Sequence, residues 1–240
     1  MTLKKIMRPD ATPLNESVPF CMLLAIVGGF LDAYTFVGRG GVFCNAQTGN
    51  IVLIGVYTAT GQWQTALNHI PPIFAFIIGV FLAEAIKRNQ SPIRYLDWKR
   101  MVLIVETAVL FVIGFIPESA PNVIVTATVS LVASIQVSSF RKLVDSQFNT
   151  TMSTGNLRSA SQALFLAVTQ KDTDAAIRSI RYFSVIFSFF SGALIGGVLT
   201  SHIGIKAIWS TIVLLIFAVV LIDMEERREK SNASVKKQVP

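Results

Sequence analysis

The sequence is poor in charge and in the residues that build catalytic or metal sites. Charged residues make up 15% of its 240 residues, and it has only two histidines and two cysteines. Cys21 and Cys44 are too few for a disulfide framework, and no His or Cys spacing typical of a metal site occurs. No phosphate-binding loop and no G-x-S-x-G motif is present. We therefore expect no metal, no cofactor and no enzyme activity.

Long apolar runs are what the chain has instead. Hydrophobic residues account for 52% of the sequence and the mean hydropathy is +0.58, both far from a soluble domain. A helix needs roughly 17–25 residues to cross a hydrocarbon core of about 30 Å. Six runs reach or approach that length: 18–37, 70–86, 101–116, 122–140, 182–200 and 207–222. The runs predict an all-α polytopic membrane protein with six transmembrane helices in a single membrane domain.

Lysine and arginine gather in every second connection between these runs. If the N-terminus is cytoplasmic, the outside segments hold only Arg39 and Lys206. The remaining basic residues fall in 1–17, 87–100, 141–181 and 224–240. This is the positive-inside pattern, so we expect both termini in the cytoplasm. It also accounts for the net charge of +7, which makes the lipid bilayer the electrostatic partner rather than nucleic acid.

The chain contains an internal repeat. Thr48-Gly49-Asn50 recurs as Thr154-Gly155-Asn156 at an offset of 106 residues, and Gly79 matches Gly192 at an offset about seven longer. The repeat divides the chain into 18–116 and 122–222, between cytoplasmic tails 1–17 and 224–240. Each half has three spans. Because three crossings leave the chain on the opposite side of the membrane, the second half starts from that side and has the opposite orientation. The sequence therefore predicts a 3+3 inverted repeat, an architecture typical of transporters.

A short apolar segment follows each copy of the tripeptide. Segments 51–60 and 157–168 reach only about half a bilayer at 1.5 Å per residue. The lead-in segments 38–47 and 145–153 are polar and cannot face lipid. We interpret each as a re-entrant loop with a half-helix. Amphipathic helices lying at the interface are one alternative, and full crossings that give eight spans and parallel repeats are another.

The polar groups near these segments are the candidate binding site. Two free helix N-termini meeting at the repeat interface favour an anionic or strongly dipolar solute. Asp32 and Glu106 lie within spans and are candidates for ion coupling, or else structural partners of other polar groups. Arg158 is either a buried cation near the midplane or one more charge on the cytoplasmic surface. The candidate substrate-binding residues are Asp32, Asn45, Gln47, Thr48, Gly49, Asn50, Thr154, Gly155, Asn156 and Arg158.

These features favour a membrane transporter or channel for a small, anionic or polar solute. An intramembrane enzyme and a non-transporting scaffold or sensor are the alternatives. The expected partners are lipid and a small molecule or ion, and self-association into a homo-oligomer stays open.

The segment that leads into the first tripeptide also carries a family resemblance. The run GGFLDAYTF at 28–36, followed by GGVFCNAQTGN at 40–50, strongly resembles the signature of the YoaK-like family of bacterial inner-membrane proteins with a domain of unknown function. Thr154-Gly155-Asn156 fits as well, so the likeness covers nearly the whole chain. The resemblance implies a multi-pass protein of the bacterial inner (plasma) membrane and supplies no catalytic residues.

Overall fold

The computed structural model describes most of the chain. It covers residues 6–9, 12–88, 98–144, 146–147, 151 and 153–238, without the side chains of 146–147 and 229–238. Most of the predicted basic loop, residues 89–97, lies outside the described residues. So does much of the second lead-in segment, residues 145, 148–150 and 152.

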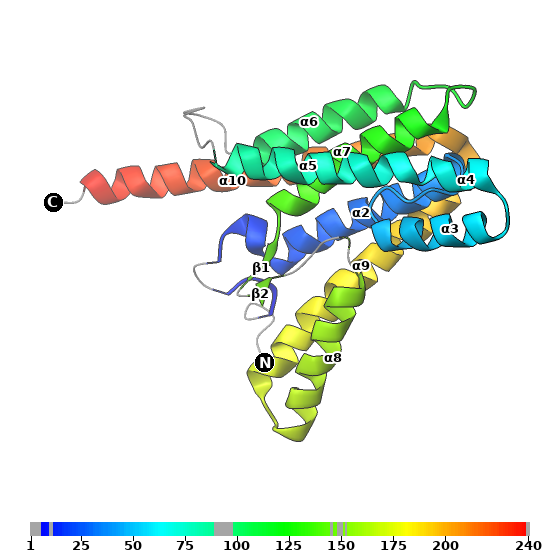
Figure 1. Cartoon of the computed structure of the whole chain (residues 1–240). Helices are drawn as coiled ribbons and strands as arrows, with labels where there is room; N and C mark the ends of the chain where they lie inside the picture. The colour runs from blue at the N-terminus through cyan, green and yellow to red at the C-terminus, as the bar shows by residue number, and fades with distance from the viewer. Residues whose placement is uncertain are drawn as a thin grey trace.

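Helices make up nearly all of the regular structure (Figure 1). They are η1 (Leu14–Glu16), α2 (Val18–Gly38), α3 (Gln47–Ala59), α4 (Trp63–Asn68), α5 (Ile70–Arg88), α6 (Trp98–Ile113), α7 (Asn122–Ser139), α8 (Ser153–Thr169), α9 (Thr173–Ile203), η2 (Gly204–Ile208) and α10 (Trp209–Gln238). The strands β1 (Lys142–Leu143) and β2 (Ser146–Gln147) form one small antiparallel hairpin. The prediction of an all-α protein is confirmed.

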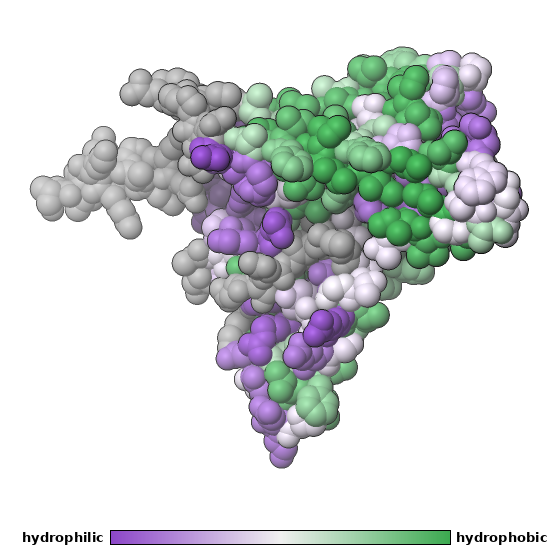
Figure 2. Space-filling model, in the orientation of Figure 1, coloured by the Kyte–Doolittle hydropathy of each residue, from purple (hydrophilic) through white to green (hydrophobic). Residues whose placement is uncertain are grey.

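The surface of the bundle is apolar enough to face lipid. In the described part of the chain, four helical stretches are long and apolar enough to cross a membrane, namely Val18–Gly38, Trp63–Arg88, Asn122–Ser139 and Thr173–Arg228. The last of these contains α9 and much of α10. Large apolar side chains such as Phe81 and Phe187 are 72% and 66% exposed, and Figure 2 shows a broad apolar surface with hydrophilic residues at either end. Water would penalise so much exposed apolar area, so the protein is a membrane protein.

The helices pack in a defined set of pairs. Helix α2 packs along α9, and α5 packs along α7. Helix α6 contacts both α7 and α10, and α10 also contacts α2. Helix α8 packs along the first part of α9, and α8 and this part of α9 diverge from the rest of the bundle (Figure 1).

The two ends of the bundle differ in chemistry. At the end we call the terminal end, Arg8 pairs with Glu225, and Arg100 Nη1 lies 2.8 Å from Asp223 Oδ1. These ion pairs tie the N-terminal segment and α6 to α10, which continues as a helix past the span boundary predicted at residue 222. At the opposite end, the loop end, Arg39 contacts the connection between α6 and α7.

Glycines let the two main helix pairs approach closely. A Cβ on Gly29 would collide with the backbone of Phe189 in α9, and one on Gly192 would collide with the backbone of Ile26 in α2. In the α5–α7 pair, a Cβ on Gly79 would collide with Ser134 and with the Leu131 carbonyl. Lipid is as apolar as a leucine side chain, so helices in a membrane associate through such close packing rather than through the hydrophobic effect.

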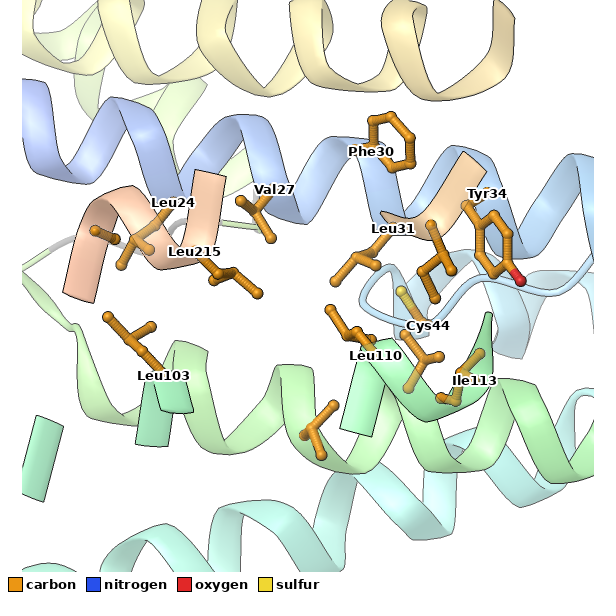
Figure 3. Close-up of a cluster of buried hydrophobic side chains, with 14 of the residues drawn as sticks. Leu24, Val27, Phe30, Leu31, Tyr34, Cys44, Leu103, Leu110, Ile113 and Leu215 are labelled. Atoms are coloured by element: carbon orange, nitrogen blue, oxygen red, sulfur yellow. The ribbon is translucent and has the colours of Figure 1, made fainter. Parts of the chain in front are cut away.

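The remaining helices pack through large aliphatic side chains. Leu24, Val27 and Leu31 of α2 face Leu103 and Leu110 of α6 (Figure 3), and Leu215 of α10 completes the cluster. All six of these side chains are fully buried. This cluster holds α6 and α10 on one side of α2 and leaves its opposite side to α9.

We expect Gly192→Ala to destabilise the protein and Gly197→Ala, five residues later in α9, to leave it unchanged or slightly more stable. A Cβ at position 192 meets the α2 backbone, whereas one at position 197 meets nothing within 4 Å. Overpacking costs about 1–3 kcal/mol, so the melting midpoint of the purified Gly192 variant should fall by roughly 2–10 °C. Equal midpoints for the two variants would show that the α2–α9 contact is looser than described.

Candidate functional site

The chain reverses direction immediately after α2. Gly40 and Gly41 have φ angles of 87° and 76°, which non-glycine residues rarely adopt. The guanidinium of Arg39 is fully buried and donates to the carbonyl oxygens of Ile116 at 2.7 Å and Pro117 at 3.2 Å. Arg39 therefore fixes the start of the loop 39–46 against the end of α6, and the glycines turn it back into the bundle.

The loop 39–46 reaches the middle of two long helices. Asn45 Nδ2 donates to the carbonyl of Gly28, the eleventh of the 21 residues of α2. Gln47 Nε2 donates to Ser130 Oγ, and Ser130 is the ninth of the 18 residues of α7. Helix α3 thus begins at mid-depth of the bundle. Its 13 residues extend about 20 Å back to the loop end, where Tyr57 stacks on His69.

Asn50 braces this loop from within α3. Its Oδ1 accepts from the Phe43 N–H at 3.0 Å, and its Nδ2 donates to the Phe43 carbonyl at 2.7 Å. His69 Nδ1 donates to the same Oδ1, and Gln47 Oε1 accepts from Nδ2. Asn50 is fully buried, and its amide is occupied by the loop.

The two carboxylate oxygens of Asp32 have different environments. Oδ1 accepts hydrogen bonds from the backbone N–H of Asn45 at 2.7 Å and of Ala46 at 3.4 Å, and from the Cys44 thiol. Ala46 is the N-cap of α3, so this oxygen satisfies amides at a positive helix end. Oδ2 is buried and has no hydrogen-bond partner among the described residues. One oxygen is thus structural and the other is unused.

The second repeated tripeptide lies at the start of α8, close to the same place. Thr151 precedes α8 and packs against Gly28, the residue whose carbonyl accepts from Asn45. Asn45 and Thr151 are 106 residues apart and therefore equivalent in the repeat. Asn45 and Thr151, which precede α3 and α8, thus both lie against the midpoint of α2.

A cavity of about 990 Å³ lies at this meeting point. It is bounded by α2, α5, α7 and α9 and by the first residues of α3 and α8. Seven of the predicted site residues line it: Asp32, Asn45, Gln47, Thr48, Gly49, Thr154 and Gly155. Three others are not among the described lining residues. Asn50 and Asn156 are buried beside it, and Arg158 is exposed on α8.

The cavity lining repeats the symmetry of the sequence. Five pairs of lining residues lie 106 residues apart, the offset that relates the two tripeptides. Two more pairs lie 113 residues apart, the offset that relates Gly79 to Gly192. The equivalent pairs that line the cavity are Asp32/Ser138, Asn45/Thr151, Gln47/Ser153, Thr48/Thr154, Gly49/Gly155, Phe76/Phe189 and Val80/Ala193. The two halves of the chain thus contribute the same positions to one cavity, with different side chains at several of them.

Glu106, the second predicted coupling residue, lies away from this cavity. It is buried between α6 and α7, where its Oε2 accepts from Gln136 Nε2 at 2.8 Å. This hydrogen bond joins α6 to α7. Glu106 Oε1 has no partner in the described part of the chain. Arg100, six residues earlier in α6, pairs with Asp223 and Glu226.

Several residues that matter to the site were missed by reasoning from the sequence. Ser130 Oγ lies 2.8 Å from the carbonyl oxygens of Cys44 and Pro72, so its hydroxyl joins the loop to α5 and α7. Cys44 inserts into the apolar cluster between Tyr34 and Ile113 (Figure 3). The position of Ser130 in the middle of an apolar run was the one available signal. Within the described residues, no group of three His, Cys, Asp or Glu side chains could hold a metal ion.

The fold and the cavity define a polytopic α-helical membrane protein with an internal polar site. The chain belongs to the family described as "Protein of unknown function (DUF1275)", whose profile matches residues 20–221. It is 28% identical over 202 residues to the UPF0700 transmembrane protein YoaK of Bacillus subtilis (strain 168), over 80% of this chain and 88% of that protein. The expected YoaK-like membership is therefore confirmed. No solved structure matches the chain.

We expect Asn50→Ala to loosen the loop 39–46. The change leaves the N–H and C=O of Phe43 without partners, at about 1–3 kcal/mol for each buried group. The fully buried Cys44 thiol should then react with a maleimide about tenfold faster or more, measured in a Cys21→Ala background. Thr48→Ala, on the exposed side of the same turn, is the matched control. Equal rates of Cys44 labelling in the two variants would show that Asn50 does not hold the loop 39–46 in place.

Proposed function

We propose that the protein is a transporter of a small polar solute, which binds in the 990 Å³ cavity. The observation that carries the proposal is the set of seven equivalent pairs in the lining. A binding site formed by equivalent positions of two repeats, at mid-depth of the bundle, is the arrangement of secondary transporters with inverted repeats.

The helix packing supports a 3+3 inverted repeat with α2, α5 and α6 in one half and α7, α9 and α10 in the other. Exchanging the halves converts the α2–α9 pair into the α7–α5 pair, and both pairs are observed. The same exchange converts α6–α7 into α10–α2 and leaves α6–α10 unchanged, and these contacts also exist. On this proposal α3 and α8 are re-entrant half-helices that enter from opposite sides.

Polar groups at this depth also favour a transporter over a scaffold or an enzyme. Polar and charged side chains inside a membrane are costly and typically mark a solute or ion pathway. Asp32 and Asn45 line the cavity, and each has one acceptor oxygen with no partner among the described residues. A scaffold has no use for such groups, and nothing about the cavity specifically favours a reaction.

We further propose that the terminal end faces the cytoplasm of a bacterium across its inner membrane. Arg8, Arg100, Lys142 and Arg227 gather there, which fits the positive-inside rule. Both described chain ends lie on that side of the bundle (Figure 1).

Transport can be tested by blocking the cavity. A thermal-shift screen of metabolites on the purified protein identifies compounds that stabilise it by mass action, and uptake of these is then measured in proteoliposomes. Thr154→Trp places a large side chain at the cavity wall and should abolish both stabilisation and uptake. Arg158→Trp, exposed one turn further along α8, should retain both.

Two outcomes would contradict the transporter assignment. Compounds that stabilise the protein but are never moved would favour a sensor or scaffold. Chemical conversion of the compound during the assay would favour an enzyme.

Orientation can be tested with single cysteines on intact cells, in a background with Cys21 and Cys44 replaced by Ala. A thiol reagent that cannot cross membranes should label Ser119→Cys, which is exposed at the loop end, and leave Lys171→Cys unlabelled. The reverse pattern would place the termini outside. A reagent that enters cells serves as the control that both cysteines react.

A further inference from the structure

The two halves of the cavity differ in chemistry where they match in position. Asp32 in the first half corresponds to Ser138 in the second, and Asn45 corresponds to Thr151. The first-half residues therefore give one side of the cavity a carboxylate and an amide that the other side lacks. We call this side the Asp32 end.

The Asp32 end holds two hydrogen-bond acceptors that nothing fills. Asp32 Oδ2 and Asn45 Oδ1 are both buried and lack a partner in the described residues. The other polar atoms of these side chains are used, since Asp32 Oδ1 binds the loop amides and Asn45 Nδ2 donates to the Gly28 carbonyl. Unpaired buried acceptors are costly, and a hydrogen-bond donor relieves that cost.

No basic side chain lies at this end within the described chain. Arg141 is the one basic side chain among the described lining residues, and it is exposed beyond the end of α7. It lies roughly 15 Å from Ser130, which marks the depth of the loop. Arg158, which the sequence left open between a buried cation and a surface charge, is exposed on α8 and is not among the described lining residues.

Much of the remaining lining is apolar or aromatic. Phe36, Phe43, Phe76 and Phe189 line the cavity, together with Ile73 and Ile77. Aromatic faces attract organic cations as well as apolar groups. Such a lining favours a solute with an apolar body and disfavours a small inorganic ion with its hydration shell.

We propose that the Asp32 end binds a protonated amine, so that the solute is an organic ammonium compound with an apolar body. This rests on the proposed function in taking the cavity as the solute site, and it replaces the expectation of an anion with a cation. The ammonium group donates to Asp32 Oδ2 and Asn45 Oδ1, and its charge offsets that of the buried carboxylate.

The test uses three probes that share a phenyl ring and differ in head group: 2-phenylethylamine, 2-phenylethanol and 3-phenylpropionate. Binding to the detergent-purified protein at pH 7 is measured by calorimetry and by the shift in melting midpoint. The ammonium probe should bind about tenfold or more tightly than the alcohol, because a charge-assisted hydrogen bond is worth at least that factor. The carboxylate should bind weakest.

Asp32→Asn replaces the unpaired acceptor Oδ2 with a hydrogen-bond donor and keeps the acceptor at Oδ1. Its amide oxygen can still accept from Asn45 and Ala46, while an N–H₂ donor stands where Oδ2 stood. The variant should lose about tenfold or more in affinity for 2-phenylethylamine. Glu106→Gln, at the buried carboxylate that lies away from the cavity, is the matched control and should bind the amine as the unaltered protein does.

Several results would overturn the inference. They are tighter binding of 3-phenylpropionate than of the amine, unchanged amine affinity in Asp32→Asn, and stabilisation by sodium chloride over choline chloride without any effect of the amine. The order of the three probes on the unaltered protein decides the sign of the charge even if Asp32→Asn fails to fold. Amine binding without uptake would overturn the transporter proposal alone, and uptake of an anion through the same cavity would overturn this inference alone.

Discussion

Irregular backbone at the depth of a membrane must have its hydrogen bonds supplied by the protein, because lipid offers none. The loop 39–46 meets this constraint with side chains from three helices. Asp32 of α2 accepts from two of its amides, Asn50 of α3 binds both backbone groups of Phe43, and Ser130 of α7 binds the carbonyl of Cys44. Without these partners the loop could not leave the loop end. Helix α3 would then not begin at mid-depth, and the cavity would lose one of its walls.

Close helix packing supplies the frame around that loop. Gly29 and Gly192 bring α2 and α9 together, and Gly79 does the same for α5 and α7. Backbones that touch leave little room for adjustment at the crossing points. The cavity lies where α3 and α8 begin, and helices of both pairs bound it.

The parts of this architecture that were predictable from the sequence depend on composition and on repeated residues. The apolar runs indicated the long helices, and the two tripeptides marked equivalent positions that line the same cavity. What could not be predicted depends on contacts between distant residues. Asn50 looked like a ligand because it is polar and repeated, but its amide is bound by a loop whose conformation the sequence does not reveal. Arg39 was assigned to an outside loop, yet its side chain is fully buried. It donates hydrogen bonds to the carbonyl oxygens of Ile116 and Pro117, which are 77 and 78 residues away in the sequence.

The symmetry of shape and the asymmetry of chemistry have different consequences. On the proposed function, equivalent positions in the two repeats let the halves exchange conformations, which is how inverted repeats alternate access to a central site. That exchange needs matching helices and crossings, and it places no demand on identical side chains. Asp32 and Asn45 correspond to Ser138 and Thr151 in the repeat, so the groups that would recognise charge belong to one half alone. Movement would then be a property of the shared frame, whereas selectivity would be a property of the first repeat.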